Sequence, residues 1–354
     1  MKVHLADQSV NRIPSLDFFR ALAILLVLLF HYKELLPFGF LGVDLFFVIS
    51  GYLVSRQYIL AVKSGERADW WSFIVKRGTK ILPSFFVFIV GGYFLAKLLF
   101  LPEYPDQVLS VTELPPYVFF YLNYVYSHPW VFKLVWSLCI EEHFYLFLTI
   151  ILVITTTLVA KGGRAKFLLV IIWLIILTAF VLRLVEYREG IANVMTTHVR
   201  MDALMLGVLL SYQELISLRI KRNSWLLFAL GALMFAVCVV SQAMSDDILV
   251  DKVLLYTFTP ISFYLMIRGS LYFSFGALGI VRLIAYYSYN GYLWHPIISF
   301  YVIYVLKLEF QFGFPLYLAL SCIAAFVMTK VIEEPGLLLR KVLLAKNNKR
   351  KVTP

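Results

Sequence analysis

The feature that most constrains the fold of this chain is a series of long apolar stretches separated by short charged segments. A helix needs about 20 mostly apolar residues to cross the hydrocarbon core of a bilayer. Ten stretches of this kind follow one another, near residues 15–36, 41–61, 81–101, 134–159, 166–186, 201–217, 225–243, 250–270, 278–306 and 313–338. They predict an all-α polytopic membrane protein with about ten transmembrane helices.

The composition supports this fold class and excludes three others. Apolar residues make up 61% of the 354 residues and charged residues 15%. Soluble domains contain about 45–50% apolar and about 25% charged residues. A soluble globule and a disordered chain are therefore excluded. A disulfide scaffold is excluded as well, because Cys139, Cys238 and Cys322 all lie inside apolar stretches. We interpret them as small buried hydrophobes.

The distribution of charge predicts the orientation of the helices. The formal net charge is +11, and basic residues gather at both ends of the chain and near residues 62–80, 161–166, 219–222 and 268–282. The loops between them, near residues 103–113 and 246–251, lean acidic. Because basic loops favour the cytoplasmic side, both termini are expected in the cytoplasm. Orientation and anionic lipid headgroups explain the basic excess, so no nucleic-acid partner is expected.

The same reading predicts one membrane domain over residues 1–340 and a basic cytoplasmic tail over residues 341–354. No internal repeat interrupts the domain. The first apolar stretch is followed by KELLPFGF and not by a small-residue cleavage site. We therefore expect the first helix to be retained and not to serve as a cleavable signal peptide.

Two ionisable residues share one face of the first predicted helix. Arg20 and His31 are eleven residues apart, which corresponds to three turns plus about 20° and to about 16 Å along the axis. In the predicted orientation, Arg20 lies toward the cytoplasm and His31 in the outer half of the membrane. Taken alone, Arg20 is also compatible with a residue that extends to the interface, and His31 with a hydrogen-bonded core histidine.

Carboxylates are expected at the depth of His31 in two other helices. Asp44 lies near the outer end of the second stretch, where it is also compatible with a helix cap. Glu141 and Glu142 follow Trp136 in the fourth stretch. Trp136 suits an interfacial aromatic belt, and adjacent glutamates point about 100° apart on a helix. A carboxylate beside His31 would orient its ring and raise its basicity, as in a general base with its orienting group.

Cations precede the third stretch, and two further polar positions stand near other helices. Arg77 and Lys80 are three residues apart, a spacing that suits a phosphate group, although anchoring at the cytoplasmic interface explains them equally well. Arg200 stands at the start of the sixth stretch, and His295 lies inside the ninth. Both are further candidates for the site.

These residues, in this order, resemble the membrane acyltransferase-3 family, which are integral-membrane O-acyltransferases that modify bacterial surface glycans. The resemblance runs from Ser15 to Pro335. It rests on Leu16-Asp17, the Arg20-x10-His31 spacing, GFLGVDLFFVISGYL (39–53), R77xxK80-ILP, WSLxxEExFYL (136–146), RMDALMLG (200–207), YLWHP (292–296) and EEP (333–335). The sequence departs from the family pattern at Lys80, where arginine is usual, and at Phe18, where glycine is frequent.

The resemblance implies transfer of an acyl group, usually acetyl, from coenzyme A to a sugar hydroxyl, without a metal. It implies that His31 is catalytic and that Arg20 helps to hold the acyl-CoA. We expect Glu142 and Asp44 to assist His31, and Arg77 and Lys80 to contact the CoA phosphates. Asp17, Glu141, Trp136, Arg200 and His295 are further candidates.

The expected setting is the bacterial inner membrane, with a lipid-linked saccharide or polysaccharide repeat unit as the acceptor. Some family members carry an additional extracytoplasmic domain, and this chain is expected to act without one. The alternative function is a transporter or flippase, because intramembrane Arg, His and Glu also form proton relays and substrate paths. Transporters often show repeated halves, which are not apparent in this sequence. A scaffold without chemistry would leave His31 and the carboxylates unexplained.

Overall fold

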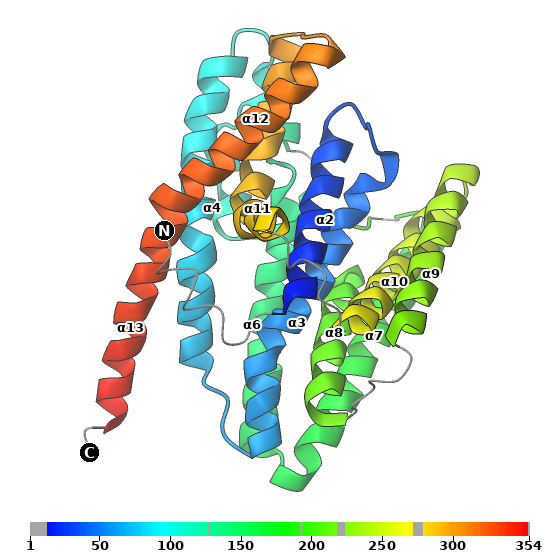
Figure 1. Cartoon of the computed structure of the whole chain (residues 1–354), viewed down its shortest axis with the longest axis vertical. Helices are drawn as coiled ribbons and strands as arrows, with labels where there is room; N and C mark the ends of the chain where they lie inside the picture. The colour runs from blue at the N-terminus through cyan, green and yellow to red at the C-terminus, as the bar shows by residue number, and fades with distance from the viewer. Residues whose placement is uncertain (1–12, 126–127, 192, 218–223, 272–278, 353–354) are drawn as a thin grey trace.

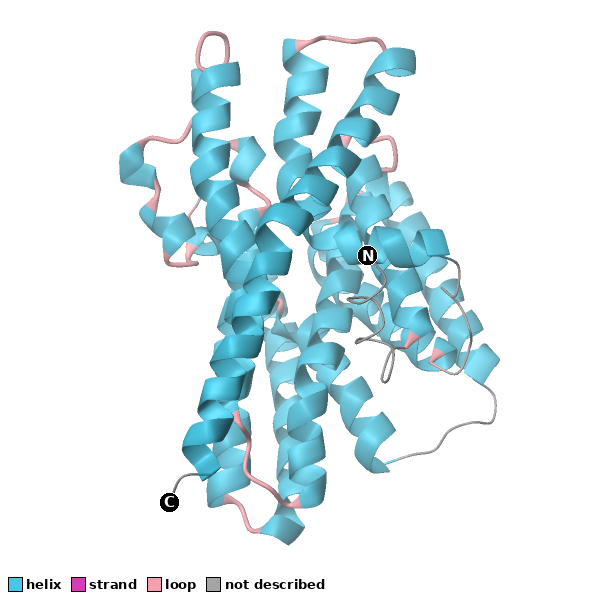
Figure 2. Cartoon of the chain, turned by 60° about the vertical axis from the view of Figure 1, so that its left-hand side comes forward, coloured by secondary structure: helices cyan, strands magenta, loops and turns pink. Residues whose placement is uncertain are grey.

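The structure is a computed structural model that describes residues 13–125, 128–191, 193–217, 224–271 and 279–352. The predicted basic residues Lys2, Arg12, Arg219, Lys221 and Arg222 lie outside these ranges. Within them the chain consists of helices and connecting loops, without a strand (Figure 2). This confirms the predicted fold class.

Within the described ranges, eight helices are long and apolar enough to cross a membrane. They are built from α2 (Pro14–His31), α3 (Gly42–Ser64), α4 (Trp70–Phe100), α6 (Val135–Leu158), α7 (Arg164–Arg188), α9 (Ser224–Met244), α10 (Leu255–Ser270) and α12 (Phe310–Met328). The short helix η2 (Pro37–Leu41) precedes α3, and the π-helix η10 (Leu249–Leu254) precedes α10. The π-helix η12 (Thr329–Glu333) joins α12 to α13 (Glu334–Val352), which lies beside α4 in Figure 1.

The sixth and ninth predicted spans are helices of a different kind. The helix α8 (Met201–Tyr212) has 12 residues and is buried from Asp202 to Tyr212. The helix α11 (Gly279–Phe300) is long, but it carries buried polar residues, which include Asn290 and His295. Both are therefore surrounded largely by protein and not by lipid. The total of ten spans and the orientation of both termini stay predictions.

Close contact between α3 and α8 forms the centre of the bundle. A side chain at Gly51 would collide with the carbonyl oxygen of Leu204, and one at Gly207 with the carbonyl oxygen of Val48. The absence of a side chain at these glycines lets the two backbones approach, as in many membrane helix pairs. The span that contains α3 is 72% buried in the protein, whereas that of α9 is 11% buried. Figure 1 shows α9 at the edge of the bundle, next to α10.

The third span begins earlier than the sequence suggests. The helix α4 starts at Trp70 and not near residue 81, because the side chain of Asp69 caps it by accepting a hydrogen bond from the backbone N–H of Ser72 at 3.1 Å. Side-chain acceptors at this position satisfy the free N–H groups of a helix start. As a result Arg77 and Lys80 lie well inside α4, on one helix as their spacing of three residues indicated.

Candidate active site

Three adjoining cavities run through the bundle. The first, which we call the basic cavity, lies between α2, α3, α4 and α13 and has a volume of about 260 Å³. The second, the middle cavity, is narrow, at about 80 Å³, and shares Arg20, Arg77 and Lys80 with the first. The third, the histidine cavity, contains His31, has a volume of about 450 Å³ and shares Val43 and Tyr292 with the second. Linked by these shared residues, the three cavities form a series from Arg20 to His31, which we call the path.

The basic cavity carries a concentrated positive charge. Five cationic side chains line it, and none of its described lining residues is an aspartate or glutamate. The five are Arg20, Lys76, Arg77, Lys80 and Arg340. The structure therefore brings together the three residues that were predicted to hold the cofactor, Arg20, Arg77 and Lys80. Such a cluster suits a ligand with several phosphate groups.

Neighbouring groups hold three of these cations in place. The Nζ atom of Lys80 lies 3.5 Å from a carboxylate oxygen of Glu333. The guanidinium of Arg77 lies over the ring of Tyr145, 4.8 Å from its centre. The Nζ atom of Lys76 donates to the side-chain oxygen of Gln57 at 3.0 Å.

Arg340 is a functional candidate that the sequence reading did not single out. It lies on α13, which packs against α4. In the sequence, Arg340 was grouped with the cations of the basic tail. The sequence feature that could have pointed to it is its position a few residues after the EEP motif.

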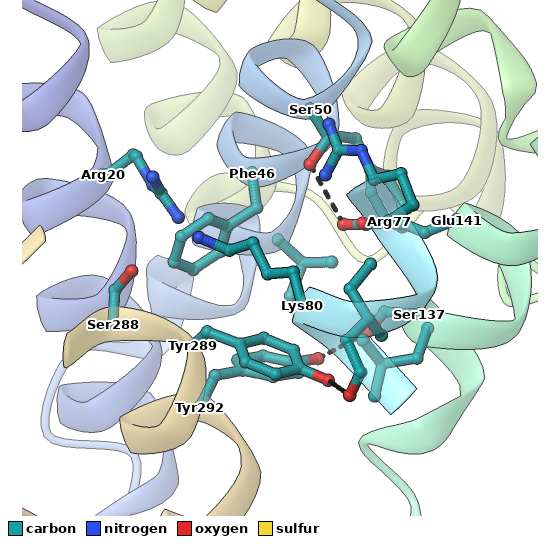
Figure 3. A pocket seen from close by; sticks show the side chains of 14 residues that line it. Arg20, Phe46, Ser50, Arg77, Lys80, Ser137, Glu141, Ser288, Tyr289 and Tyr292 are labelled. Carbon is teal, nitrogen blue, oxygen red and sulfur yellow. Dashed lines mark hydrogen bonds between the residues drawn. The ribbon is translucent and has the colours of Figure 1, made fainter. Parts of the chain in front are cut away.

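The middle cavity distinguishes the two adjacent glutamates of α6. Glu141 lines it and accepts a hydrogen bond from Ser50 Oγ at 3.3 Å (Figure 3). It also accepts a hydrogen bond from the hydroxyl of Tyr145. Glu142, which was predicted to assist catalysis, is not among the described residues that line the three cavities. Neighbouring positions on a helix face different directions, so only one of the two reaches the path.

His31 is the last residue of α2 and projects into the histidine cavity. Its Nδ1 atom lies 3.0 Å from the carbonyl oxygen of Val27. Because a carbonyl oxygen can only accept, Nδ1 carries the proton and Nε2 carries the lone pair. A backbone carbonyl therefore orients the ring, where the sequence reading expected a carboxylate.

Asp44, the carboxylate that was expected beside His31, pairs with Arg200 instead. A carboxylate oxygen of Asp44 lies 2.8 Å from Nη2 of Arg200, and each side chain is 1% exposed. The guanidinium also lies 4.2 Å from the centre of the Tyr256 ring and 5.9 Å from that of Trp136. Arg200 and Trp136 both line the histidine cavity. The buried pair thus fixes part of the cavity wall.

His295 lies directly beside His31. The centres of the two rings are 4.7 Å apart, and the ring planes are nearly perpendicular. His295 is fully buried, and its Nδ1 atom lies 2.7 Å from the carbonyl oxygen of Tyr292. Its Nε2 atom has no hydrogen-bond partner among the described residues. The remaining candidate, Asp17, is half-buried in the first turn of α2, three residues before Arg20.

The comparisons with known proteins agree on one family. The profile of a family described as an acyltransferase domain matches residues 13–332. A protein of Staphylococcus aureus strain COL, named as a putative O-acetyltransferase, is 30% identical over 220 residues, which are 58% of this chain and 35% of that protein. The peptidoglycan O-acetyltransferase OatA of Listeria monocytogenes is 32% identical over 144 residues, which are 38% of this chain and 23% of that protein. The chain therefore spans about a third of the length of the first of these relatives. No solved structure matches.

Proposed function

Because the chain belongs to the acyltransferase domain family, we propose that it transfers an acyl group, in the simplest case acetyl, from acyl-CoA to a hydroxyl of a glycan. The observation that supports this proposal is the path of three cavities between five cations and His31. A transporter would equally need polar groups inside the membrane. It would not need a broad cationic site that narrows before it reaches a histidine.

The dimensions of the path suit acyl-CoA. Its phosphate groups would lie among Arg20, Arg77, Lys80 and the other cations of the basic cavity. Its thin, uncharged pantetheine arm would occupy the narrow middle cavity, where Ser50 and Glu141 offer hydrogen-bonding groups. Arg20 and His31 are separated by about 16 Å along α2, at 1.5 Å per residue. The thioester would then lie in the histidine cavity.

His31 would act as a general base in this reaction. Its Nε2 lone pair would take the proton of the acceptor hydroxyl while the hydroxyl oxygen attacks the thioester carbonyl. Collapse of the tetrahedral intermediate breaks the C–S bond, and the leaving thiolate takes the proton back from His31. The Val27 carbonyl keeps Nδ1 protonated throughout. No base other than His31 is required for the proton balance.

The other candidates would support His31 indirectly. We assign Asp44 a positioning role, because it holds Arg200 in the wall of the histidine cavity. We assign Glu141, in place of Glu142, the contact with the donor in the middle cavity. His295 would hold the ring of His31 through the edge-to-face contact.

The orientation of the path fits a reaction across the bacterial inner membrane. If both termini are cytoplasmic, the basic cavity faces the side that contains CoA, and the histidine cavity faces outward. OatA of Listeria monocytogenes is named as a peptidoglycan O-acetyltransferase, which supports a cell-envelope glycan as the acceptor class.

The test is acyl transfer by the purified protein in lipid nanodiscs, with radiolabelled acetyl-CoA and a set of envelope saccharides. His31→Ala should lower the rate of transfer by about 10²–10⁴-fold, the usual contribution of a general base. The matched control is His198→Ala, because His198 is partly exposed and pairs with Glu186 at 2.7 Å, outside the three cavities. Full transfer by His31→Ala would contradict the assignment. Movement of a saccharide without an acylated product would support the transporter.

A further inference from the structure

An apolar groove lies on the outside of the bundle between α9 and α10. It has a volume of about 670 Å³, and apart from Cys238 and Ser241 all of its lining residues are Leu, Val, Met or Phe. Several of these side chains are exposed, among them Leu233 at 63% and Val237 at 56%. Because α9 is the least buried of the candidate spans, the groove faces the region that lipid would occupy.

The groove borders the histidine cavity. Leu255 lines both spaces. At two further places, adjacent residues line different spaces. Ser241 lines the groove and Gln242 lines the cavity. In the same way, Val250 lines the groove and Asp251 lines the cavity. The end of α9 and the helix η10 therefore form a common boundary. A molecule that lies in the groove therefore lies next to the cavity that contains His31.

The lining of the histidine cavity includes charged and aromatic side chains. Lys252 and Lys133 supply positive charge, and Asp251 and Glu34 supply carboxylate oxygens. Trp130, 36% exposed, presents its ring within 5.7 Å of His31, centre to centre. Lysines can bind phosphate, carboxylates accept hydrogen bonds from sugar hydroxyls, and an aromatic face suits the apolar side of a sugar ring.

We propose that the groove holds the hydrocarbon tail of a lipid-phosphate-linked saccharide, whose sugar then lies in the histidine cavity as the acyl acceptor. The phosphate would lie at the boundary, near Lys252. This inference rests on the proposed function and specifies its acceptor: a saccharide that is still attached to its lipid carrier. A finished, lipid-free polysaccharide would have no use for the groove.

The length of the groove agrees with such a tail. Leu230 and Ser241 mark its extent along α9, and eleven residues of helix correspond to about 16 Å. That is about half of the hydrocarbon core of a bilayer, which is about 30 Å thick. A tail that starts at the histidine cavity would therefore reach the middle of the membrane before it leaves the protein.

The test compares two acceptors of the same sugar in nanodiscs: polyprenyl-diphosphate-linked N-acetylglucosamine and its water-soluble methyl glycoside. Leu233→Trp and Val237→Trp should fill the groove and raise the KM for the lipid-linked acceptor at least tenfold, while the KM for acetyl-CoA stays unchanged. The matched control is Leu174→Trp, because Leu174 on α7 is 58% exposed and does not line the groove. Lys252→Ala should raise the KM for the lipid-linked acceptor more than the KM for the methyl glycoside, because the glycoside carries no phosphate.

Binding provides a readout that does not depend on activity. Polyprenyl phosphate with a photoreactive group in its tail should crosslink to peptides of α9 and α10, and Leu233→Trp should reduce this labelling severalfold. If excess phosphatidylglycerol competes with the labelling as efficiently as unlabelled polyprenyl phosphate does, the inference is overturned, because the groove would then hold bulk lipid. Equal KM values for the two acceptors would also overturn it, while leaving the acyltransferase proposal intact. Crosslinking without any acyl transfer would instead count against the proposed function.

Discussion

The buried pair of Asp44 and Arg200 permits a sharp test of whether Asp44 has a structural or a chemical role. The change is Asp44→Asn, which keeps the size of the side chain and removes its charge. Both partners are 1% exposed and lie 2.8 Å apart. The Nε and Nη1 atoms of Arg200 have no hydrogen-bond partner among the described residues, so Asp44 is the main compensation for the buried guanidinium.

The magnitude follows from that geometry. Removing one member of a buried ion pair costs about 3–5 kcal/mol, because the other charge is left uncompensated. Contacts of the guanidinium with the rings of Tyr256, Phe47 and Trp136 moderate this loss. We therefore expect Asp44→Asn to lower the free energy of unfolding by about 3 kcal/mol. A second variant, Asp44→Asn with Arg200→Met, removes both charges and should recover most of the loss.

The free energy of unfolding is measured in a mild detergent by titration with denaturant, with tryptophan fluorescence as the signal. The rate of acyl transfer is measured in parallel. If Asp44 only positions Arg200, the double variant should recover stability and a large part of the transfer rate. A double variant that is stable and inactive would refute the positioning role and assign a chemical function to one of the two residues. A change below about 0.5 kcal/mol for Asp44→Asn, the usual range for surface substitutions, would show that the pair does not compensate the buried charge.

Three further predictions concern the path. Arg340→Ala should raise the KM for acetyl-CoA by about tenfold or more, because a hydrogen bond to a charged group contributes about 1.5–3 kcal/mol. Steady-state kinetics should show no such rise for Arg188→Ala, since Arg188 is exposed. Glu141→Gln should reduce transfer more than Glu142→Gln, because only Glu141 lines the middle cavity; equal effects would contradict this assignment. His295→Gln should lower kcat about tenfold with an unchanged KM for acetyl-CoA, because it affects the orientation of the base and not the binding of the donor.

The membrane helices could be predicted from the sequence because each depends on a local property, a run of apolar residues. Eight of the ten predicted stretches correspond to helices that meet this criterion by length and composition. The helix α11 does not, because Asn290 and other polar residues in it find partners within the bundle: Asn290 donates to Thr329 and Glu333, each at 2.9 Å. A polar residue that is satisfied by a distant helix cannot be recognised from hydropathy.

The spacing of Arg20 and His31 could be predicted from the sequence, but the lateral contacts of the site could not. The spacing is a property of one helix, and Arg20 and His31 do line separate cavities of the path. Which carboxylate lies beside which cation depends on how helices far apart in the sequence pack together. For this reason the partner of Asp44 was not foreseen, and neither was the orientation of His31 by Val27.

The early start of α4 changes the meaning of the cations that precede the third apolar stretch. In a loop, Lys76, Arg77 and Lys80 would serve only to orient the neighbouring helices. Because the Asp69 cap starts the helix at Trp70, these residues instead occupy a helix face that forms one wall of the basic cavity. A cation at the end of a membrane helix can reach the interface and avoids most of the cost of burial. The same residues can therefore determine topology and bind an anionic donor, and a search for charges deep within the spans would miss such a site.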